Sequence, residues 1–300
     1  MIYKGVYHLF YQHHPNKPVL LASEMEWGHS TSMDLINWTQ QPIILKPSEP
    51  YDRKGCWSGS VTILPNNNPD ILYSGNPAIL FTGNDKDGVQ SQNLARPKTP
   101  SDPYLKEWVK SDRNPVMKAT RSDTSFRDPS TAWRLPDNKW RVTIGTLDGE
   151  RGTAALFTSK DFETWTASDH PLHFADGVGL WECPDFFPVY IGKPLGVDTS
   201  VIGPEVKHVL KVSVDNFHHD IYTIGTYDTE RDIYIPNEGS IENDLGLRLD
   251  YGKFYASKSF FDDKTNRRIL WGWINESSTQ EDNTKRGWAG LQVISVTPSS

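Results

Sequence analysis

The most informative segment of this chain reads Ser-Met-Asp-Leu-Ile-Asn-Trp and covers residues 32–38. It combines a serine, an aspartate, a large apolar residue and, three positions later, a tryptophan. Close copies are Asp-Pro-Tyr-Leu-Lys-Glu-Trp at residues 102–108 and Ser-Lys-Asp-Phe-Glu-Thr-Trp at residues 159–165. The three tryptophans are therefore 70 and then 57 residues apart. A repeat of roughly this length is typical of four-stranded propeller blades.

A second series of segments recurs with nearly the same spacing. Each member has a polar or charged tip beside an aromatic residue. The members are Trp57–Val61, Phe126–Ser130 and Trp181–Phe186. In a propeller, equivalent tips meet at one mouth of the central channel. We therefore predict a β-propeller with these tips at one mouth. The alternative is a β-sandwich in which the similarity between the segments is accidental.

The rest of the chain also has an all-β pattern. Short runs of β-branched and aromatic residues alternate with clusters of Gly, Pro, Asn and Asp, and helical periodicity is scarce. The 21 prolines of the chain further disfavour long helices. The expected strands are Val6–Tyr11, Val61–Leu64, Ile79–Thr82, Trp140–Ile144, Ala154–Thr158, His208–Val214, Ile221–Tyr227 and Ile269–Ile274.

Composition excludes several classes of function. The chain has 300 residues, which is enough to bury a substantial core without disulfide bonds, and only two cysteines. Its 31 basic and 38 acidic residues give a net charge of −7, with no basic run, so we expect no nucleic acid or membrane partner. The longest apolar stretches, such as Ile269–Trp273, are too short to span a bilayer. The high aromatic content, with eleven tryptophans, fits stacked sheets or a sugar-binding surface.

The first residues lead directly into a predicted strand. No charged region followed by an apolar region precedes that strand, so the chain shows no secretory signal peptide. Two glycosylation sequons are nevertheless present, at Asn37 and at Asn275. Together these features lead us to expect a fragment of a secreted glycoprotein.

Two carboxylates have unusual neighbours. Asp128 lies between Arg127 and Pro129, where an adjacent cation favours the ionised carboxylate and the proline stiffens the turn. Glu182 follows Trp181 and precedes Cys-Pro, and an apolar neighbourhood raises the pKa of a carboxyl group. One charged and one protonated carboxyl group is the division of labour in glycoside hydrolysis. The alternative is an ordinary Arg–Asp salt bridge and a glutamate at a strand edge.

Other chemistries lack their sequence patterns. The nine histidines and two cysteines show no H-x-x-x-H or C-x-x-C spacing, so we predict no metal site. The chain also contains no G-x-S-x-G elbow and no G-x-x-x-x-G-K-[ST] loop. We therefore expect no cofactor.

At these tips the sequence resembles the plant members of glycoside hydrolase family 32, which are cell-wall invertases and fructan exohydrolases. The resemblance covers nearly the whole chain in the order of the family. The segments that carry it are Tyr7–Gln12, Trp27–Ser30, Trp57–Ser60, Phe126–Pro129, Trp181–Pro188, Lys211–Tyr227, Tyr251–Lys258 and Arg267–Trp273.

The resemblance implies a fold with one part missing. The family has a five-bladed β-propeller followed by a β-sandwich, and this chain resembles only the propeller. We accordingly expect a truncated propeller domain over residues 1–292, with an incomplete first blade, and an unmatched tail over residues 293–300. We also expect a monomer, located in the cell wall or the vacuole.

The resemblance further implies a retaining β-fructofuranosidase that removes terminal fructose from fructans or splits sucrose. In this comparison Glu182 is the acid/base and Asp128 stabilises the transition state. The residues that match the family's sugar pocket are Gln12, Trp57, Ser58 and Arg127, with Asp215 on the glucose side of sucrose.

Three departures from the family bear on activity and specificity. The family's nucleophile lies in W-M-N-D-P-N-G, directly before the strand that begins here at Met1, and this motif occurs nowhere in the chain. We therefore expect the 300-residue chain alone to have little or no fructosidase activity. A W-G-N near Leu20–Ser23 is absent, and His218 stands where invertases commonly have lysine, which favours fructan.

Three alternatives to an active fructan exohydrolase remain. The first is an invertase specific for sucrose. The second is a propeller that binds fructan or sucrose without catalysis. The third is a fragment that does not fold stably, because a ring that lacks a strand leaves an unpaired edge.

Overall fold

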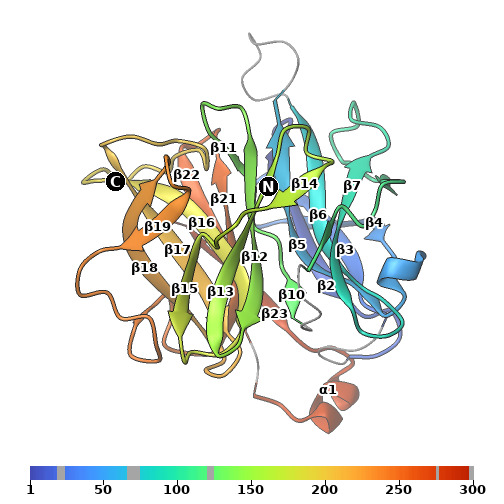
Figure 1. Ribbon diagram of the computed structural model, residues 1–300. Helices are drawn as coiled ribbons and strands as arrows, with labels where there is room; N and C mark the ends of the chain where they lie inside the picture. Colours follow the sequence, from blue (N-terminus) through green and yellow to red (C-terminus); the bar gives the residue numbers. More distant parts are fainter. Residues whose placement is uncertain (19–23, 66–74, 120–124, 275–276, 297–300) are drawn as a thin grey trace.

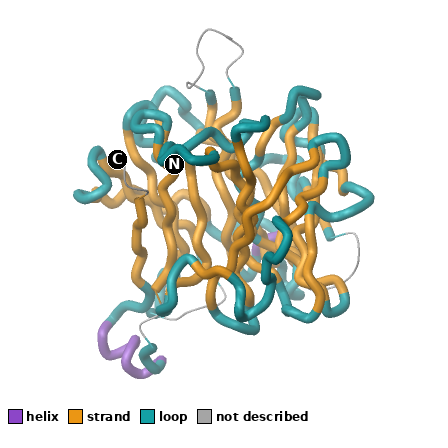
Figure 2. Tube along the Cα trace, turned by 90° about the vertical axis from the view of Figure 1, so that its left-hand side faces the viewer, coloured by secondary structure: helices purple, strands orange, loops and turns teal. Residues whose placement is uncertain are grey.

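The computed structural model describes residues 1–18, 24–65, 75–119, 125–274 and 277–296. Strands dominate it (Figure 1). The helical elements in the described residues are a 3₁₀ turn at Pro50–Asp52 and the short helix α1 at Gln280–Arg286. Figure 1 and Figure 2 both show α1 beyond the ends of the strands, outside the body of the molecule.

The strands form five antiparallel sheets, each built from consecutive strands, which are the five blades of a β-propeller. Blade 1 contains β1 (Ile2–Tyr3), β2 (Val6–His13), β3 (Glu26–Ser32) and β4 (Trp38–Leu45). Blade 2 contains β5 (Gly55–Leu64), β6 (Asn76–Asn84), β7 (Gln90–Pro97), β8 (Trp108–Lys110) and β9 (Met117–Lys118). Blade 3 contains β10 (Phe126–Arg127), β11 (Trp133–Arg134), β12 (Trp140–Asp148), β13 (Arg151–Ser159), β14 (Trp165–Ala167) and β15 (His173–Asp176).

The last two blades complete the ring. Blade 4 contains β16 (Trp181–Tyr190), β17 (Val206–Val214), β18 (His219–Asp228), β19 (Ile233–Pro236) and β20 (Leu247–Arg248). Blade 5 contains β21 (Phe254–Asp262), β22 (Arg267–Ile274) and β23 (Leu291–Val296). The predicted five-bladed β-propeller is confirmed, and each of the eight predicted strands lies within one of these strands.

The repeated tryptophan motif forms the turn between β3 and β4 in blade 1, between β7 and β8 in blade 2, and between β13 and β14 in blade 3. The turn forms because the aspartate side chain accepts hydrogen bonds from backbone N–H groups. Oδ1 of Asp34 accepts hydrogen bonds from the N–H groups of Ile36 and Asn37, at 2.9 and 2.8 Å. Oδ1 of Asp161 accepts the same pair of bonds from residues 163 and 164. Such local bonds are the reason that aspartate favours turns.

The apolar residue of the motif has an unusual backbone conformation. Leu35, Leu105 and Phe162 have φ values of 67°, 46° and 65°. The tryptophan then closes the turn, since the indole N–H of Trp38 donates to the carbonyl of Leu35 at 3.1 Å, and that of Trp108 to the carbonyl of Leu105 at 2.9 Å. The sequence repeat therefore corresponds to a structural repeat at the outer edge of the blades.

Buried aromatic side chains fill the gaps between neighbouring blades. Trp27 of blade 1 packs edge to face on Phe81 of blade 2, with ring centroids 6.5 Å apart. Trp133 of blade 3 packs on Phe186 of blade 4 at 5.0 Å. Because each buried side chain of this size contributes about 1.5–3 kcal/mol, these contacts hold the blades together.

The ring closes between blades 1 and 5 through side chains. The Tyr7 hydroxyl of β2 donates a hydrogen bond to Oδ2 of Asp262 on β21, at 2.9 Å. Trp38 packs edge to face on Trp271, with ring centroids 5.5 Å apart. Among the described residues no strand pair joins these two blades.

The ends of the propeller differ in detail from the sequence expectation. The first blade has a strand in the innermost position, β1, although it is only two residues long. Residues 293–296 were expected in an unmatched tail, but they belong to β23. All six residues of β23, Leu291–Val296, pair with Ile269–Ile274 of β22. The sequon residue Asn275 and the segment 20–23 lie outside the described residues.

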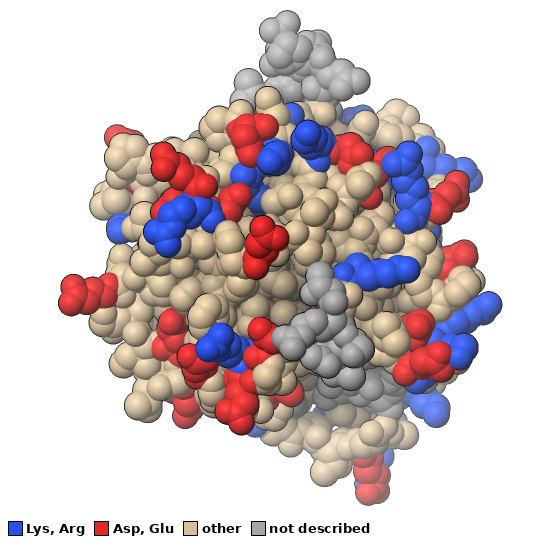
Figure 3. All heavy atoms as spheres, in the orientation of Figure 1, with Lys and Arg blue, Asp and Glu red and all other residues tan. Residues whose placement is uncertain are grey.

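The surface is mixed in charge on the face drawn in Figure 3. Basic and acidic side chains are interspersed there, without an extended basic patch. In the described part of the chain, no helix is long and apolar enough to cross a membrane. The same residues contain no cluster of three or more histidine, cysteine or acidic side chains that would hold a metal ion.

Candidate functional site

The innermost strands of blades 2, 4 and 5 share one irregularity. The pairing register shifts between Cys56 and Gly59, between Glu182 and Asp185, and between Tyr255 and Lys258. In each case three steps on the inner strand match two on its neighbour, which is a β-bulge. Bulges are frequent beside active sites because they redirect side chains.

Blade 3 has an equivalent turn at the end of its inner strand. Arg127 pairs with Gly145, and the next pairing is made by the N–H of Ser130, which donates to the carbonyl of Thr143 at 2.9 Å. Between them Asp128 has a φ of 65°, as Cys183 and Ala256 have φ values of 45° and 54° in the other bulges. The second series of sequence segments, with its tips at Trp57, Asp128 and Glu182, therefore occupies equivalent positions in blades 2, 3 and 4.

Glu182 is held by side chains of both neighbouring blades. Its Oε1 accepts hydrogen bonds from Nε and Nη2 of Arg127, at 2.9 and 2.6 Å. Its Oε2 accepts a hydrogen bond from the hydroxyl of Tyr255. The side chain is only 18% exposed. Burial and the nearby charge of Asp128 raise the pKa of Glu182, while the positive charge of Arg127 opposes this shift.

Asp128 lies next to Glu182 across the blade boundary. Its Oδ2 accepts hydrogen bonds from the backbone N–H of Cys183 at 3.0 Å and from the thiol of Cys183 at 3.5 Å. Its own N–H donates to Oγ1 of Thr82 on blade 2, at 2.9 Å. The residue is 5% exposed, so two carboxylates share a largely buried position at the inner ends of blades 3 and 4.

Arg127 has a different partner from the one that the sequence indicates. Adjacency in the chain predicts a salt bridge with Asp128, but both hydrogen bonds from the guanidinium group to a carboxylate are made to Glu182. Successive side chains along an extended chain point in different directions, so neighbours in sequence diverge. The alternative of an ordinary Arg127–Asp128 salt bridge is therefore wrong.

Three more of the predicted residues lie on blades 1 and 2. Trp57 and Ser58 occupy the bulge of β5 and are half-buried, and the carbonyl of Trp57 accepts a hydrogen bond from Nε1 of Trp27 at 2.9 Å. Gln12 lies on β2 opposite Trp27 in the sheet and is half-buried. Within the described residues, no hydrogen bond joins these three side chains to Asp128 or Glu182.

Asp215 and His218 lie in the turn between β17 and β18, and both are exposed. The N–H of Asp215 donates to the carbonyl of Leu180 at 3.2 Å. The ring of His218 lies edge-on to that of Tyr255, with centroids 6.4 Å apart. This turn is therefore next to the tyrosine that contacts Glu182.

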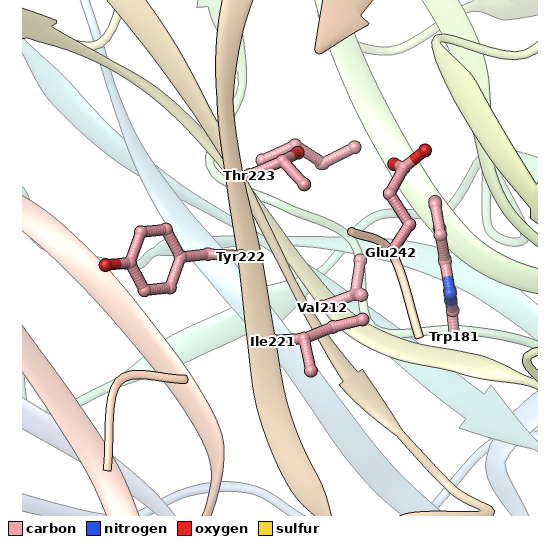
Figure 4. Close-up of a pocket in the computed structure, with 7 residues that line it drawn as sticks. Trp181, Val212, Ile221, Tyr222, Thr223 and Glu242 are labelled. Carbon is pink, nitrogen blue, oxygen red and sulfur yellow. The ribbon is translucent and has the colours of Figure 1, made fainter. Parts of the chain in front are cut away.

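Two open spaces lie apart from the carboxylates. A cavity of about 10 Å³ in blade 4 is lined by Trp181, Glu242 and apolar side chains of β17 and β18 (Figure 4). That volume matches one water molecule and excludes a sugar. A groove of about 390 Å³ lies between blades 1 and 2 and is lined by Asp34, Asn37, Tyr104 and other residues.

A comparison with models of protein families identifies the family of this chain. The model of the glycosyl hydrolases family 32 N-terminal domain matches residues 1–297. The chain belongs to glycoside hydrolase family 32. The resemblance found in the sequence is confirmed, and so is the fold that it implies.

Relatives of this family 32 chain have names that specify two activities. It is 63% identical over 300 residues to a fructan 6-exohydrolase of Beta vulgaris, covering 98% of this chain and 48% of the relative. It is 54% identical over 299 residues to a β-fructofuranosidase of Arabidopsis thaliana, the insoluble isoenzyme CWINV5, covering 98% and 51%. The chain thus spans about half the length of these relatives.

A crystal structure with the same fold is that of fructan 1-exohydrolase IIa from Cichorium intybus. The TM-score is 0.91 with 47% sequence identity, over 97% of this chain and 53% of that one. A second structure of that enzyme, a variant, contains 1-kestose. A relative from Pisum sativum, 51% identical over 98% of this chain and 52% of its own length, is named a cell wall isozyme.

Sequence reasoning missed three polar residues of this family 32 site. Tyr255 bonds Glu182, and two lysines, Lys211 and Lys258, place their ammonium groups beneath the bulges. All three lie inside segments that carry the family resemblance. No local spacing marks them, because the partners that fix them at the site are distant in the chain. Cys183 is 28 residues from Lys211, Glu182 is 73 from Tyr255, and Ser60 is 198 from Lys258.

Proposed function

We propose that this family 32 chain provides the acid/base and the transition-state stabiliser of a β-fructofuranosidase that removes terminal fructosyl units from fructans with retention. The observation that carries the proposal is the position of Glu182. Its carboxyl group is held between Arg127 and Tyr255, and the residue that follows it donates two hydrogen bonds to Asp128. The pair brings a proton donor and a fixed negative charge together.

Glu182 acts as the general acid in this proposal. Its raised pKa favours the protonated form that must give a proton to the leaving oxygen. Oε1 already receives two donors from Arg127, so Oε2, beside Tyr255, is the oxygen that carries the transferable proton. After the leaving group departs, the same oxygen accepts a proton from water.

Asp128 stabilises the transition state in this proposal. Glycoside hydrolysis passes through a positively charged, oxocarbenium-like state, which a fixed carboxylate favours. Among the described contacts only Oδ2 is engaged, which leaves Oδ1 for a fructose hydroxyl. We assign Arg127, Gln12, Trp57 and Ser58 to the wall of the fructosyl pocket.

In this proposal, neither Glu182 nor Asp128 is the nucleophile. A retaining mechanism needs a carboxylate that bonds covalently to the sugar. The family motif W-M-N-D-P-N-G is absent from the 300 residues. We therefore propose that these residues alone bind fructosyl ligands without turnover, and that hydrolysis belongs to the protein at the full length of its relatives.

Fructan is the proposed substrate, in preference to sucrose. His218 stands three residues after Asp215, next to Tyr255, in the position where invertases commonly have lysine. Histidine, unlike lysine, is not charged throughout the neutral pH range, so it orients a carboxylate less firmly. The identity of 63% to a protein named fructan 6-exohydrolase agrees with this proposal. The cell wall is the proposed location, as the name of the pea relative suggests.

The proposal is tested by measuring fructose release by the full-length enzyme from levan-type oligomers, 1-kestose and sucrose. We expect release from all three, with the highest kcat/KM on a fructan. The 300-residue chain serves as the comparison and should bind without releasing fructose. A full-length enzyme that releases no fructose from any of them would overturn the proposal.

A further inference from the structure

We propose that Lys258 is a positioning residue, whose ammonium group fixes the turn that presents Asp128 and provides a buried positive charge near the carboxylate of Asp128. The inference rests on the proposed function and adds a residue that is distinct from the two catalytic carboxylates. It is carried by the contacts of one side chain with two other blades.

Lys258 lies on β21, immediately after the bulge of blade 5. Its Nζ donates to Oγ of Ser60 at 3.0 Å, to the carbonyl of Asp128 at 3.2 Å and to the carbonyl of Pro129 at 2.7 Å. An ammonium group has three N–H donors, so all three are satisfied. A single side chain therefore joins the inner ends of blades 2, 3 and 5.

The two carbonyl contacts act on a strained turn. Asp128 has a φ of 65°, in the left-handed region, which a residue with a Cβ adopts only where its surroundings hold it there. Pro129 follows it and has no N–H to donate, so the turn depends on its acceptors. Because Lys258 binds both carbonyl groups, it holds Asp128 in the orientation in which Cys183 reaches the carboxylate.

The charge of Lys258 has no direct carboxylate partner among these contacts. Two other lysines that are largely buried each have one: Lys110 lies 2.5 Å from Asp52, and Lys211 lies 3.9 Å from Asp220. The three acceptors around Lys258 are neutral oxygens. A neutral donor would satisfy them at a lower desolvation cost, so the positive charge itself points to a role toward the carboxylates.

The electrostatic surroundings fit this role. Burial lowers the pKa of Lys258, and the charges of Asp128 and Asp185 oppose that shift. The other titratable or charged groups around the site include Arg127, Glu182, Cys183, Lys211, Asp215 and Tyr255. Removing one cation from this set makes the remaining carboxylates harder to ionise.

The test uses the full-length enzyme, 1-kestose as substrate, and three variants. For Lys258→Met we expect kcat to fall about 100-fold, as for other small displacements of a catalytic group. We also expect the pH profile of kcat/KM to move upward by about one pH unit, since a nearby cation shifts a carboxylate by this order. Lys258→Gln keeps donors and should recover part of kcat but not the pH profile. Lys258→Arg keeps the charge and should retain the pH profile even where kcat falls.

Lys110→Met is the matched control. It removes a largely buried lysine in blade 2, so it should lower the melting temperature without moving the pH profile. An unmoved profile in Lys258→Met and Lys258→Gln would overturn the inference, as would full recovery of both readouts by Lys258→Gln. A wild-type enzyme that releases no fructose would instead refute the proposed function, so the two failures are distinguishable.

Discussion

The Tyr255 hydroxyl donates a hydrogen bond to Oε2 of Glu182, across the boundary between blades 5 and 4. The bond joins residues 73 positions apart in the chain. It places a neutral donor on the one carboxylate oxygen that Arg127 does not occupy. The protonation of Glu182 therefore depends on both neighbouring blades.

Tyr255→Phe tests this relationship. The hydrogen bond from Tyr255 lowers the pKa of Glu182 and so opposes the effect of burial. Without it the pKa rises further, and the basic limb of the pH profile of kcat moves to higher pH. The expected movement is up to about one pH unit, since a hydrogen bond contributes about 1 kcal/mol and one pKa unit is about 1.4 kcal/mol. A movement to lower pH contradicts this reading.

Asp128→Asn removes the negative charge and keeps the shape of the side chain. Its amide oxygen can still accept from Cys183, so the fold should survive. Because the charge acts on the transition state, we expect kcat to fall about 100- to 1,000-fold while KM for 1-kestose changes little. Circular dichroism of the variant provides the control for folding. If KM instead rose about 100- to 1,000-fold while kcat stayed unchanged, Asp128 would be assigned to substrate binding alone.

His218→Lys tests the proposed specificity. If lysine orients Asp215 toward glucose, the variant should raise kcat/KM for sucrose about tenfold, which corresponds to about 1.4 kcal/mol. The value for levan-type oligomers should change less, because their acceptor unit is fructosyl. Unchanged sucrose turnover would remove His218 from the explanation, and a wild type that clearly prefers sucrose would assign the enzyme to the invertases.

His208 gives a prediction for stability against pH. It is buried on β17 and stacks on Phe186 at 5.0 Å, and burial lowers its pKa from 6.5 to about 4. Between these values the unfolded chain binds a proton that the folded chain does not, so the free energy of unfolding falls as the pH drops from about 6.5 to about 4.

His208→Phe should make that decline shallower by up to about 1.4 kcal/mol per pH unit, the contribution of one proton. Urea unfolding at pH 6.5 and pH 5 measures the difference. His170→Gln changes an exposed histidine and serves as the control. The same slope in wild type and His208→Phe would show that His208 does not carry the effect.

The sequence predicted the blades because their signals are local. The outer turns are closed by bonds within three residues, such as that from Trp38 to Leu35, so their pattern is legible in the chain. The site was predictable only in part. Its contacts join residues tens of positions apart, and the true partner of Arg127 is 55 residues away, not its neighbour.

The central claim is that Glu182 supplies the proton to the leaving group. The most direct measurement compares Glu182→Gln with wild type at full length, on 1-kestose and on a fructoside with an activated aryl leaving group. Glutamine keeps the shape but has no transferable proton, so we expect a loss of about 10²–10⁴-fold for 1-kestose and a much smaller loss in the first step for the activated fructoside. Equal losses on both substrates would contradict the assignment of Glu182 as the acid.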